Sequence, residues 1–174
     1  MDTLIPLIAA LPLAGFVVTA AIGRRLGKGA HCIPVVAVAA SWLSSMVVVA
    51  TALTGGFAEG GHTVRLWDWI PAGGFHVEAA FLVDNLTACL LIVVTTIGLL
   101  VHVYSIGYMS HDPGYWRFFA YLNLFMFSML LLVLGDSWLT VFVAWELVGL
   151  SSYLLIGFWY RKNSAALASK KAFI

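Results

Sequence analysis

The chain has 174 residues, of which 62% are hydrophobic and only 10% are charged, and its formal net charge is +1. Ordinary soluble domains carry roughly 25% charged residues, so this composition excludes a soluble globular protein and predicts an integral membrane protein. A net charge this small gives no general attraction to nucleic acid or to acidic substrates. We therefore expect the lipid bilayer as its surroundings and no nucleic-acid partner.

Apolar runs long enough to cross a bilayer recur along the chain. A hydrocarbon core about 30 Å thick takes roughly 17 to 25 helical residues. Five runs reach this length, at residues 4–22, 32–53, 79–104, 118–134 and 138–160. A sixth run begins near Ala165 and stops in mid-run at Ile174. The sequence therefore predicts an all-α, polytopic membrane protein with five full transmembrane helices and the start of a sixth, and we expect a longer protein beyond it.

Basic residues alternate between the connections and predict the orientation. If the N-terminus is outside, the outer loops hold only Arg65. The inner loops then hold Arg24, Arg25, Lys28, Arg117, Arg161 and Lys162. Cytoplasmic loops carry the excess of lysine and arginine in membrane proteins, so we expect the N-terminus outside.

The long outer connection, residues 54–78, contains TVRLWDWIPAGGFHVEA. Two alternating runs flank the Pro-Ala-Gly-Gly segment, which is typical of a β-hairpin. We expect this small outer hairpin at about residues 61–79.

The third span carries a polar stripe. In steps of 3.6 residues, Asp84, Thr87, Thr95, Gly98 and His102 fall within about 60° of one line. Such a stripe should face neighbouring helices or a hydrated interior rather than lipid. It is explained either by helix packing or by a proton route through His102 and Asp84, since histidine titrates near physiological pH.

The fifth span, FVAWELVGLSSYLLIGFWY, holds a single carboxylate, Glu146. A charge at the bilayer centre costs roughly 2.5 to 3.5 kcal/mol on insertion scales, so intramembrane acids usually mark functional sites. Gly149, Tyr153 and Gly157 share its helix face and should bring another helix close. We expect Glu146 to transfer protons, with His102 and Tyr153 as further candidates. The alternative is a glutamate that only ties two helices together through a salt bridge.

Other chemistries lack their motifs. The sequence has no phosphate loop, no dinucleotide-binding glycine pattern and no supportable Ser/His/Asp set. Its two cysteines are not spaced for metal ligation, and only His102 lies deep in a span, whereas a membrane haem needs paired axial ligands. We expect no cofactor and no metal in this chain.

Residues 104–174 contain a long and specific pattern. Residues 145–159 match W-E-x-V-G-x-x-S-Y-L-L-I-G-[FW]-[WY], and the inner loop before the fourth span has the sequence YMSHDPGYWRFF. This region closely resembles the antiporter-like L subunit of bacterial NADH:quinone oxidoreductase, the counterpart of complex I subunit 5. The earlier stretch FHVEAAFLVDNLTACLL is also similar to it. The first two spans match in length and orientation more than in motif.

The resemblance implies a proton-translocating membrane subunit without redox centres of its own. NADH, FMN, iron-sulfur clusters and quinone would then belong to other subunits, and the partners would be other antiporter-like membrane-arm subunits in a bacterial inner membrane. Residues 1–117 would form helices one to three with the hairpin, and residues 118–174 the start of the first antiporter-like inverted repeat. In this family Glu146 is the intramembrane acid thought to pair with a lysine on a broken seventh helix, which lies beyond this sequence.

A second family resembles the same region. The large subunit of multi-subunit cation/proton antiporters is similar around Glu146. Valine and glycine at positions 148 and 149, the inner-loop sequence and the KKAFI ending favour the respiratory subunit. A fragment with a purely structural or assembly role is a third interpretation.

Overall fold

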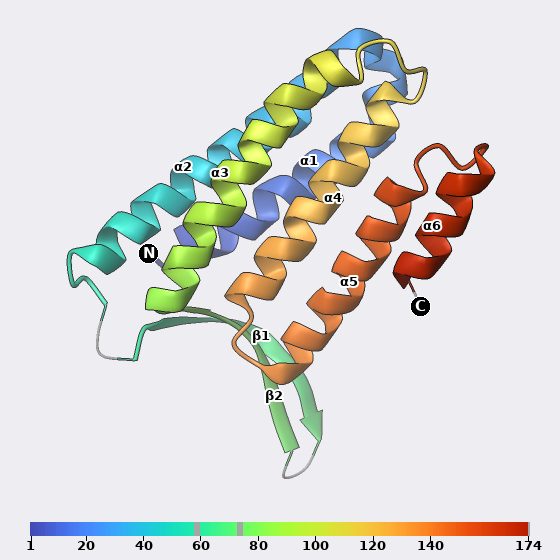
Figure 1. The fold of residues 1–174 in the computed structure, drawn as a ribbon. Coiled ribbons are helices and arrows are strands. Elements are labelled where there is room, and N and C mark those ends of the chain that lie inside the picture. The colour runs from blue at the N-terminus through green and yellow to red at the C-terminus, as the bar shows by residue number, and fades with distance from the viewer. Residues whose placement is uncertain (58–59, 73–74, 174) are drawn as a thin grey trace.

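A computed structural model of the protein describes residues 1–57, 60–72 and 75–173. Long helices lie side by side in a bundle, with a two-stranded hairpin at one end and a short helix at one edge (Figure 1). The long helices are α1 (Leu4–Leu26), α2 (Cys32–Leu53), α3 (Asn85–Tyr108), α4 (Tyr115–Leu134) and α5 (Trp138–Ile156). The remaining elements are the 3₁₀ turn η1 (Gly27–His31), β1 (His62–Ala72), β2 (Phe75–Val83) and α6 (Asn163–Phe173).

Helices α1 and α2 form one apolar helical stretch that is folded back on itself at η1. The stretch covers Leu4–Leu53, 50 residues, and the described residues contain three other helices long and apolar enough to cross a membrane, α3, α4 and α5. The chain reverses at Gly27, whose φ of 55° lies in the left-handed region that glycine adopts freely. The Ser41 hydroxyl of α2 donates to the Ile8 carbonyl of α1 at 2.6 Å, so the two arms are in direct contact.

Helix α4 lies at the centre of the bundle and packs against α1, α3 and α5. The main apolar cluster includes Ile8 of α1, Val38 of α2, Leu91 of α3 and Leu130 of α4, all fully buried. Small residues allow this close packing: a Cβ added at Gly15 of α1 would lie 2.8 Å from the Ala37 Cβ of α2 and would also meet an α4 side chain. Membrane helices commonly associate through such small residues.

The predicted hairpin is confirmed, although it runs to Val83 and is longer than expected. Its second strand includes residues 79–83, which the sequence analysis assigned to the third span. These residues are apolar because they pack on the core as a strand: Phe81 is 5% exposed and bridges Gly135 after α4. The helix begins only after Asp84, whose side chain accepts a hydrogen bond from the Thr87 amide at 2.7 Å. An N-cap of this kind fixes where a helix starts.

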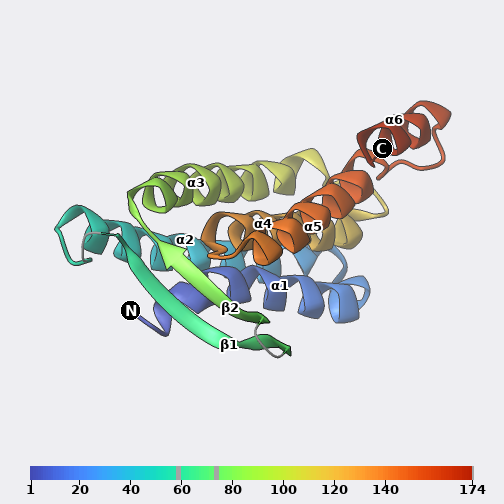
Figure 2. The ribbon, with the colours of Figure 1, turned by 90° about the horizontal axis from the view of Figure 1, so that it is seen from below.

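The fifth helix is shorter than the expected span of residues 138–160. It ends at Ile156, and the following turn folds back so that Phe158 is only 4% exposed. Helix α6 then packs along α5 at the edge of the bundle, away from α1 and α2 (Figures 1 and 2).

Three of the connections between helices lie together at one end of the bundle. They are η1, the α3–α4 loop and the α5–α6 turn, and the hairpin lies at the opposite end with the N-terminus (Figure 1). A contact of 2.8 Å between Asp2 and the His62 imidazole places the N-terminus beside the start of β1. The basic residues that the sequence analysis assigned to one side therefore do share one end of the molecule.

Candidate functional site

The polar stripe of α3 faces the other helices, as expected. Thr87, Thr95 and His102 are buried, and Gly98 lies against the Met126 side chain of α4. The Thr95 hydroxyl donates to the Leu91 carbonyl, one turn earlier, at 2.6 Å, so its hydrogen bond is made within its own helix. Packing therefore accounts for most of the stripe, and His102 is the titratable group that it buries.

Both ring nitrogens of His102 have partners. The imidazole is 0% exposed. Its Nδ1 donates to the Gly98 carbonyl at 2.7 Å, since a carbonyl only accepts. Its Nε2 lies 2.9 Å from Oδ1 of Asn123 on α4, which is also 0% exposed. This hydrogen bond joins α3 to α4 in the interior of the bundle.

The amide of Asn123 gives this pair two protonation arrangements. With Oδ1 facing the ring, both imidazole nitrogens donate and the ring carries a positive charge. With the amide turned over, its Nδ2 donates to a neutral Nε2. In the first arrangement Nδ2 is buried without a hydrogen-bond partner among the described residues, beside Gly15. A protonated His102 ring would therefore fit the amide with Oδ1 toward Nε2, and a neutral ring would fit the amide turned over.

Sequence reasoning did not select Asn123. The available signal was a lone amide in the middle of the apolar run at residues 118–134. An uncharged polar residue at such a depth needs a hydrogen-bond partner, and His102 was a polar side chain already expected to face the bundle interior.

Glu146 lies on an exposed face of α5. Within residues 1–57, 60–72 and 75–173 it makes no hydrogen bond and no salt bridge. Its helix is little covered by the rest of the chain, since its only buried residues are Thr140, Ala144 and Ser151. The neighbouring large side chain of Trp145 is 67% exposed.

The helix face that Glu146 shares with Gly149, Tyr153 and Gly157 is covered at one end only. A Cβ added at Gly157 would lie 3.1 Å from the Ser169 side chain of α6, and the Tyr153 ring contacts the Phe173 ring with centroids 5.6 Å apart. A Cβ added at Gly149 would meet nothing within 4 Å among the described residues. The expected close helix is thus present beside Gly157 as α6, and the part of the face around Glu146 is open.

The three candidate residues do not form one cluster. His102 points into the α3–α4 interface, whereas Glu146 lies on the open part of α5 and Tyr153 lies beside α6. The described residues show no hydrogen bond between His102 and the other two. The described part of the chain also contains no group of three His, Cys, Asp or Glu side chains placed to hold a metal ion.

Comparisons with known proteins identify relatives over most of the chain. Residues 69–119 match the family model described as NADH-ubiquinone oxidoreductase (complex I), chain 5 N-terminus. Residues 135–174 match the model described as NADH:quinone oxidoreductase/Mrp antiporter, TM. These two regions together cover just over half of the sequence.

Two curated relatives show how far the likeness extends. NADH-quinone oxidoreductase subunit L of Mycobacterium tuberculosis (strain ATCC 25618 / H37Rv) is 45% identical over 168 residues, which are 97% of this chain and 26% of the relative. NAD(P)H-quinone oxidoreductase chain 5 of Synechocystis sp. is 52% identical over 110 residues, 63% of this chain and 16% of the relative. The chain thus spans about a quarter of the length of its curated relatives, or less.

The fold also has a solved counterpart. A chain of the membrane-bound sulfane sulfur reductase, an archaeal respiratory membrane complex, superposes with a TM-score of 0.83 at 16% sequence identity. The match covers 99% of this chain and 33% of that chain. The helix arrangement, the family matches and the WELVGLSSYLLIGFW segment agree with one another. The chain belongs to the family of the antiporter-like L subunit, or chain 5, of NADH-quinone oxidoreductase.

Proposed function

We propose that this chain is part of a proton-translocating membrane subunit of NADH:quinone oxidoreductase, in which Glu146 carries protons. The observation that carries the proposal is a carboxylate in the apolar helix α5 of a chain from this family, on a face that the described residues leave open. A carboxylate in lipid is costly, by roughly 2.5 to 3.5 kcal/mol on insertion scales. Another part of the full-length protein should therefore cover Glu146.

A basic residue on that covering segment would make Glu146 a switchable proton site. A cation nearby favours the carboxylate, and its withdrawal favours the protonated acid. A partner that moves during turnover would then load and release a proton at Glu146. Tyr153 lies two turns along the same helix face and would extend the route.

His102 provides a second position for protons in the bundle. Proton uptake at Nε2 accompanies rotation of the Asn123 amide, so a proton could enter and leave without breaking the bond between Nδ1 and the Gly98 carbonyl. We propose His102 as a relay with this asparagine as its positioning residue.

The proposed topology has five full crossings and an outer N-terminus. A single straight helix of 50 residues would be roughly 75 Å long, far beyond one bilayer, and the reversal at Gly27 supports two crossings by the stretch Leu4–Leu53. The basic loops at one end favour that end as the inner side of a bacterial inner membrane.

Redox chemistry is assigned to other subunits. NADH, FMN, iron-sulfur clusters and quinone would be bound elsewhere in the complex, and this subunit would couple quinone reduction to proton pumping. Its proposed partners are other antiporter-like subunits of the membrane arm.

The test uses sealed vesicles from the source membranes. NADH-driven acidification should require the full-length subunit and should be unchanged when choline replaces sodium. Acidification that needs sodium would instead support a cation/proton antiporter, the alternative that the second family description also names. Acidification that persists at the normal rate without the subunit would refute the proposal.

A further inference from the structure

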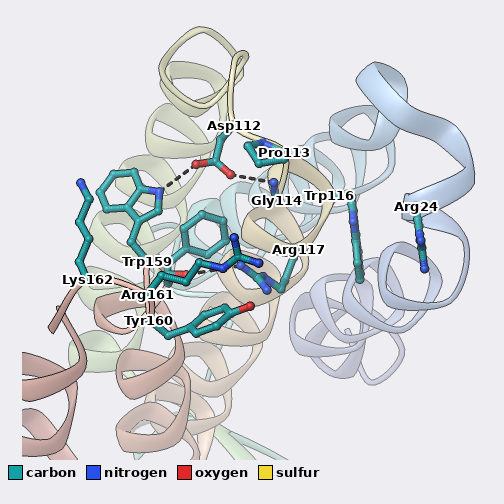
Figure 3. A pocket seen from close by; sticks show the side chains of 11 residues that line it. Arg24, Asp112, Pro113, Gly114, Trp116, Arg117, Trp159, Tyr160, Arg161 and Lys162 are labelled. Atoms are coloured by element: carbon teal, nitrogen blue, oxygen red, sulfur yellow. Dashed lines mark hydrogen bonds between the residues drawn. The ribbon is translucent and has the colours of Figure 1, made fainter.

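A basic pocket lies at the end of the bundle that holds η1, the α3–α4 loop and the α5–α6 turn. It has a volume of about 580 Å³, within the size range of ordinary ligand sites. Its walls come from the end of α1, the α3–α4 loop, the start of α4 and the α5–α6 turn (Figure 3). Four basic side chains line it, Arg24, Arg117, Arg161 and Lys162, against one acidic side chain, Asp112.

The acidic residue of the pocket is already engaged by its own loop and by the α5–α6 turn. One oxygen of Asp112 accepts from the Gly114 amide at 2.7 Å, and the other accepts from Nε1 of Trp159 at 2.8 Å (Figure 3). Among the described residues, no carboxylate forms a salt bridge with any of the four basic side chains. The pocket therefore has an excess of positive charge, with four basic side chains against one carboxylate that pairs with none of them.

Arg117 is held in place with donors unused. Its guanidinium stacks on the Phe158 ring, 4.9 Å from the centroid, and on the Tyr160 ring at 5.4 Å. One terminal nitrogen donates weakly to the Phe158 carbonyl at 3.4 Å. The buried Nε has no hydrogen-bond partner among the described residues. A planar guanidinium fixed in this way suits two-point binding of a phosphate.

The Tyr160 hydroxyl lies close to the same basic side chains. Hydrogen bonding with the Arg117 guanidinium, and after it with that of Arg161, lowers the pKa of this phenol below its ordinary value of 10.0. The Lys162 ammonium lies 5.0 Å from the Trp159 ring centroid, at the rim of the pocket. Tryptophan and tyrosine beside basic groups at helix ends are typical of the level at which lipid headgroups lie.

We propose that this pocket binds the phosphate of an anionic phospholipid headgroup in the inner leaflet. Basic pockets between transmembrane helices on the cytoplasmic side bind such headgroups. The lipid is favoured over free phosphate because the pocket lies at the ends of apolar helices, where acyl chains can continue along the bundle. The site is separate from Glu146 and does not depend on proton transfer there.

The test measures lipid retained by the complex containing the full-length subunit. The complex is placed in nanodiscs of phosphatidylcholine with or without phosphatidylglycerol, re-extracted and analysed by native mass spectrometry, and inorganic phosphate is added in a separate arm. Arg161→Gln should weaken phosphatidylglycerol retention about threefold, as expected for one exposed charged contact. The matched control is Arg25→Gln, which removes the same charge from an exposed residue near the same end that does not line the pocket.

A second variant separates charge from geometry. Arg117→Lys keeps the positive charge but loses the planar fork, and retention should fall about tenfold. Equal retention by Arg161→Gln, Arg117→Lys and the control would overturn the proposal. Binding of inorganic phosphate with no preference for phosphatidylglycerol over phosphatidylcholine would overturn the assignment to a lipid.

Discussion

The hydrogen bond between His102 and Asn123 should couple α3 to α4 measurably. The perturbation is a double-mutant cycle of His102→Leu, Asn123→Leu and the double variant in the full-length chain. Both side chains are 0% exposed and the bond is 2.9 Å long, so each single change leaves a buried polar group without its partner. Such a loss costs about 1 to 3 kcal/mol, whereas the double variant removes both polar groups and leaves an apolar contact.

The coupling itself should be modest. Interhelical hydrogen bonds in membrane proteins average about 0.6 kcal/mol and reach about 1.7 kcal/mol, because the unfolded chain in the membrane also finds partners. Full burial and the short distance place this pair in the upper half of that range. We therefore expect the sum of the two single losses of unfolding free energy to exceed the loss in the double variant by about 1 to 1.7 kcal/mol.

The assay is reversible unfolding of the purified full-length subunit in mixed micelles, titrated with sodium dodecyl sulfate and followed by circular dichroism. The four unfolding free energies give the coupling directly. Effects that add within about 0.5 kcal/mol would mean that the two side chains do not interact, and the assignment of this pair would then be wrong.

Three further predictions follow from the fold. Single cysteines at Gly61 and Lys28, introduced in a chain without its native cysteines, should be labelled from opposite faces of the membrane, and labelling from one face would refute the topology. Gly15→Val should lower the unfolding free energy by about 1 to 3 kcal/mol because its side chain would meet α2 and α4, whereas Gly29→Ala, with open space around it, should be neutral. Asp84→Ala should lower the unfolding free energy by about 0.5 to 2 kcal/mol because the helix loses its N-cap. The Thr87 amide lowers the pKa of the Asp84 carboxyl, so the stabilisation by the ionised carboxylate should be present above pH 3.8 and disappear as the pH falls through the lowered value. An acid titration of wild type against the variant would show this loss.

Much of the fold was predictable because its signals are periodic. Apolar length predicts the helices, the alternating runs around Pro-Ala-Gly-Gly predict the hairpin, and the 3.6-residue spacing predicts that the α3 stripe faces inward. The assignment of residues 79–83 was wrong because an apolar strand packed on a core has the same composition as the start of a membrane helix. The pairing of this segment with β1 and the cap at Asp84 distinguish them in the structure.

The site was predictable only in part. Glu146 is conspicuous as the one carboxylate in its span, but sequence could not say which face of α5 the chain covers. Asn123 gives no periodic signal, and its role follows from its contact with His102. The basic pocket joins residues that are far apart in the sequence, Arg24, Asp112 and Arg161 among them, and only the packing of the helices brings their connections together.

The central claim is that Glu146 carries protons, and Glu146→Gln tests it most directly. Glutamine keeps the size and most of the hydrogen-bonding capacity but removes the titratable proton, and Asp136→Asn, an exposed carboxylate outside the helices, is the control. Assembly on native gels and NADH-driven proton pumping are measured in the same membranes. We predict that the Gln variant assembles, keeps NADH oxidation by the peripheral redox subunits and loses most proton pumping, while Glu146→Asp is milder and the control pumps normally. Pumping at the wild-type rate by a fully assembled Gln variant would contradict the account.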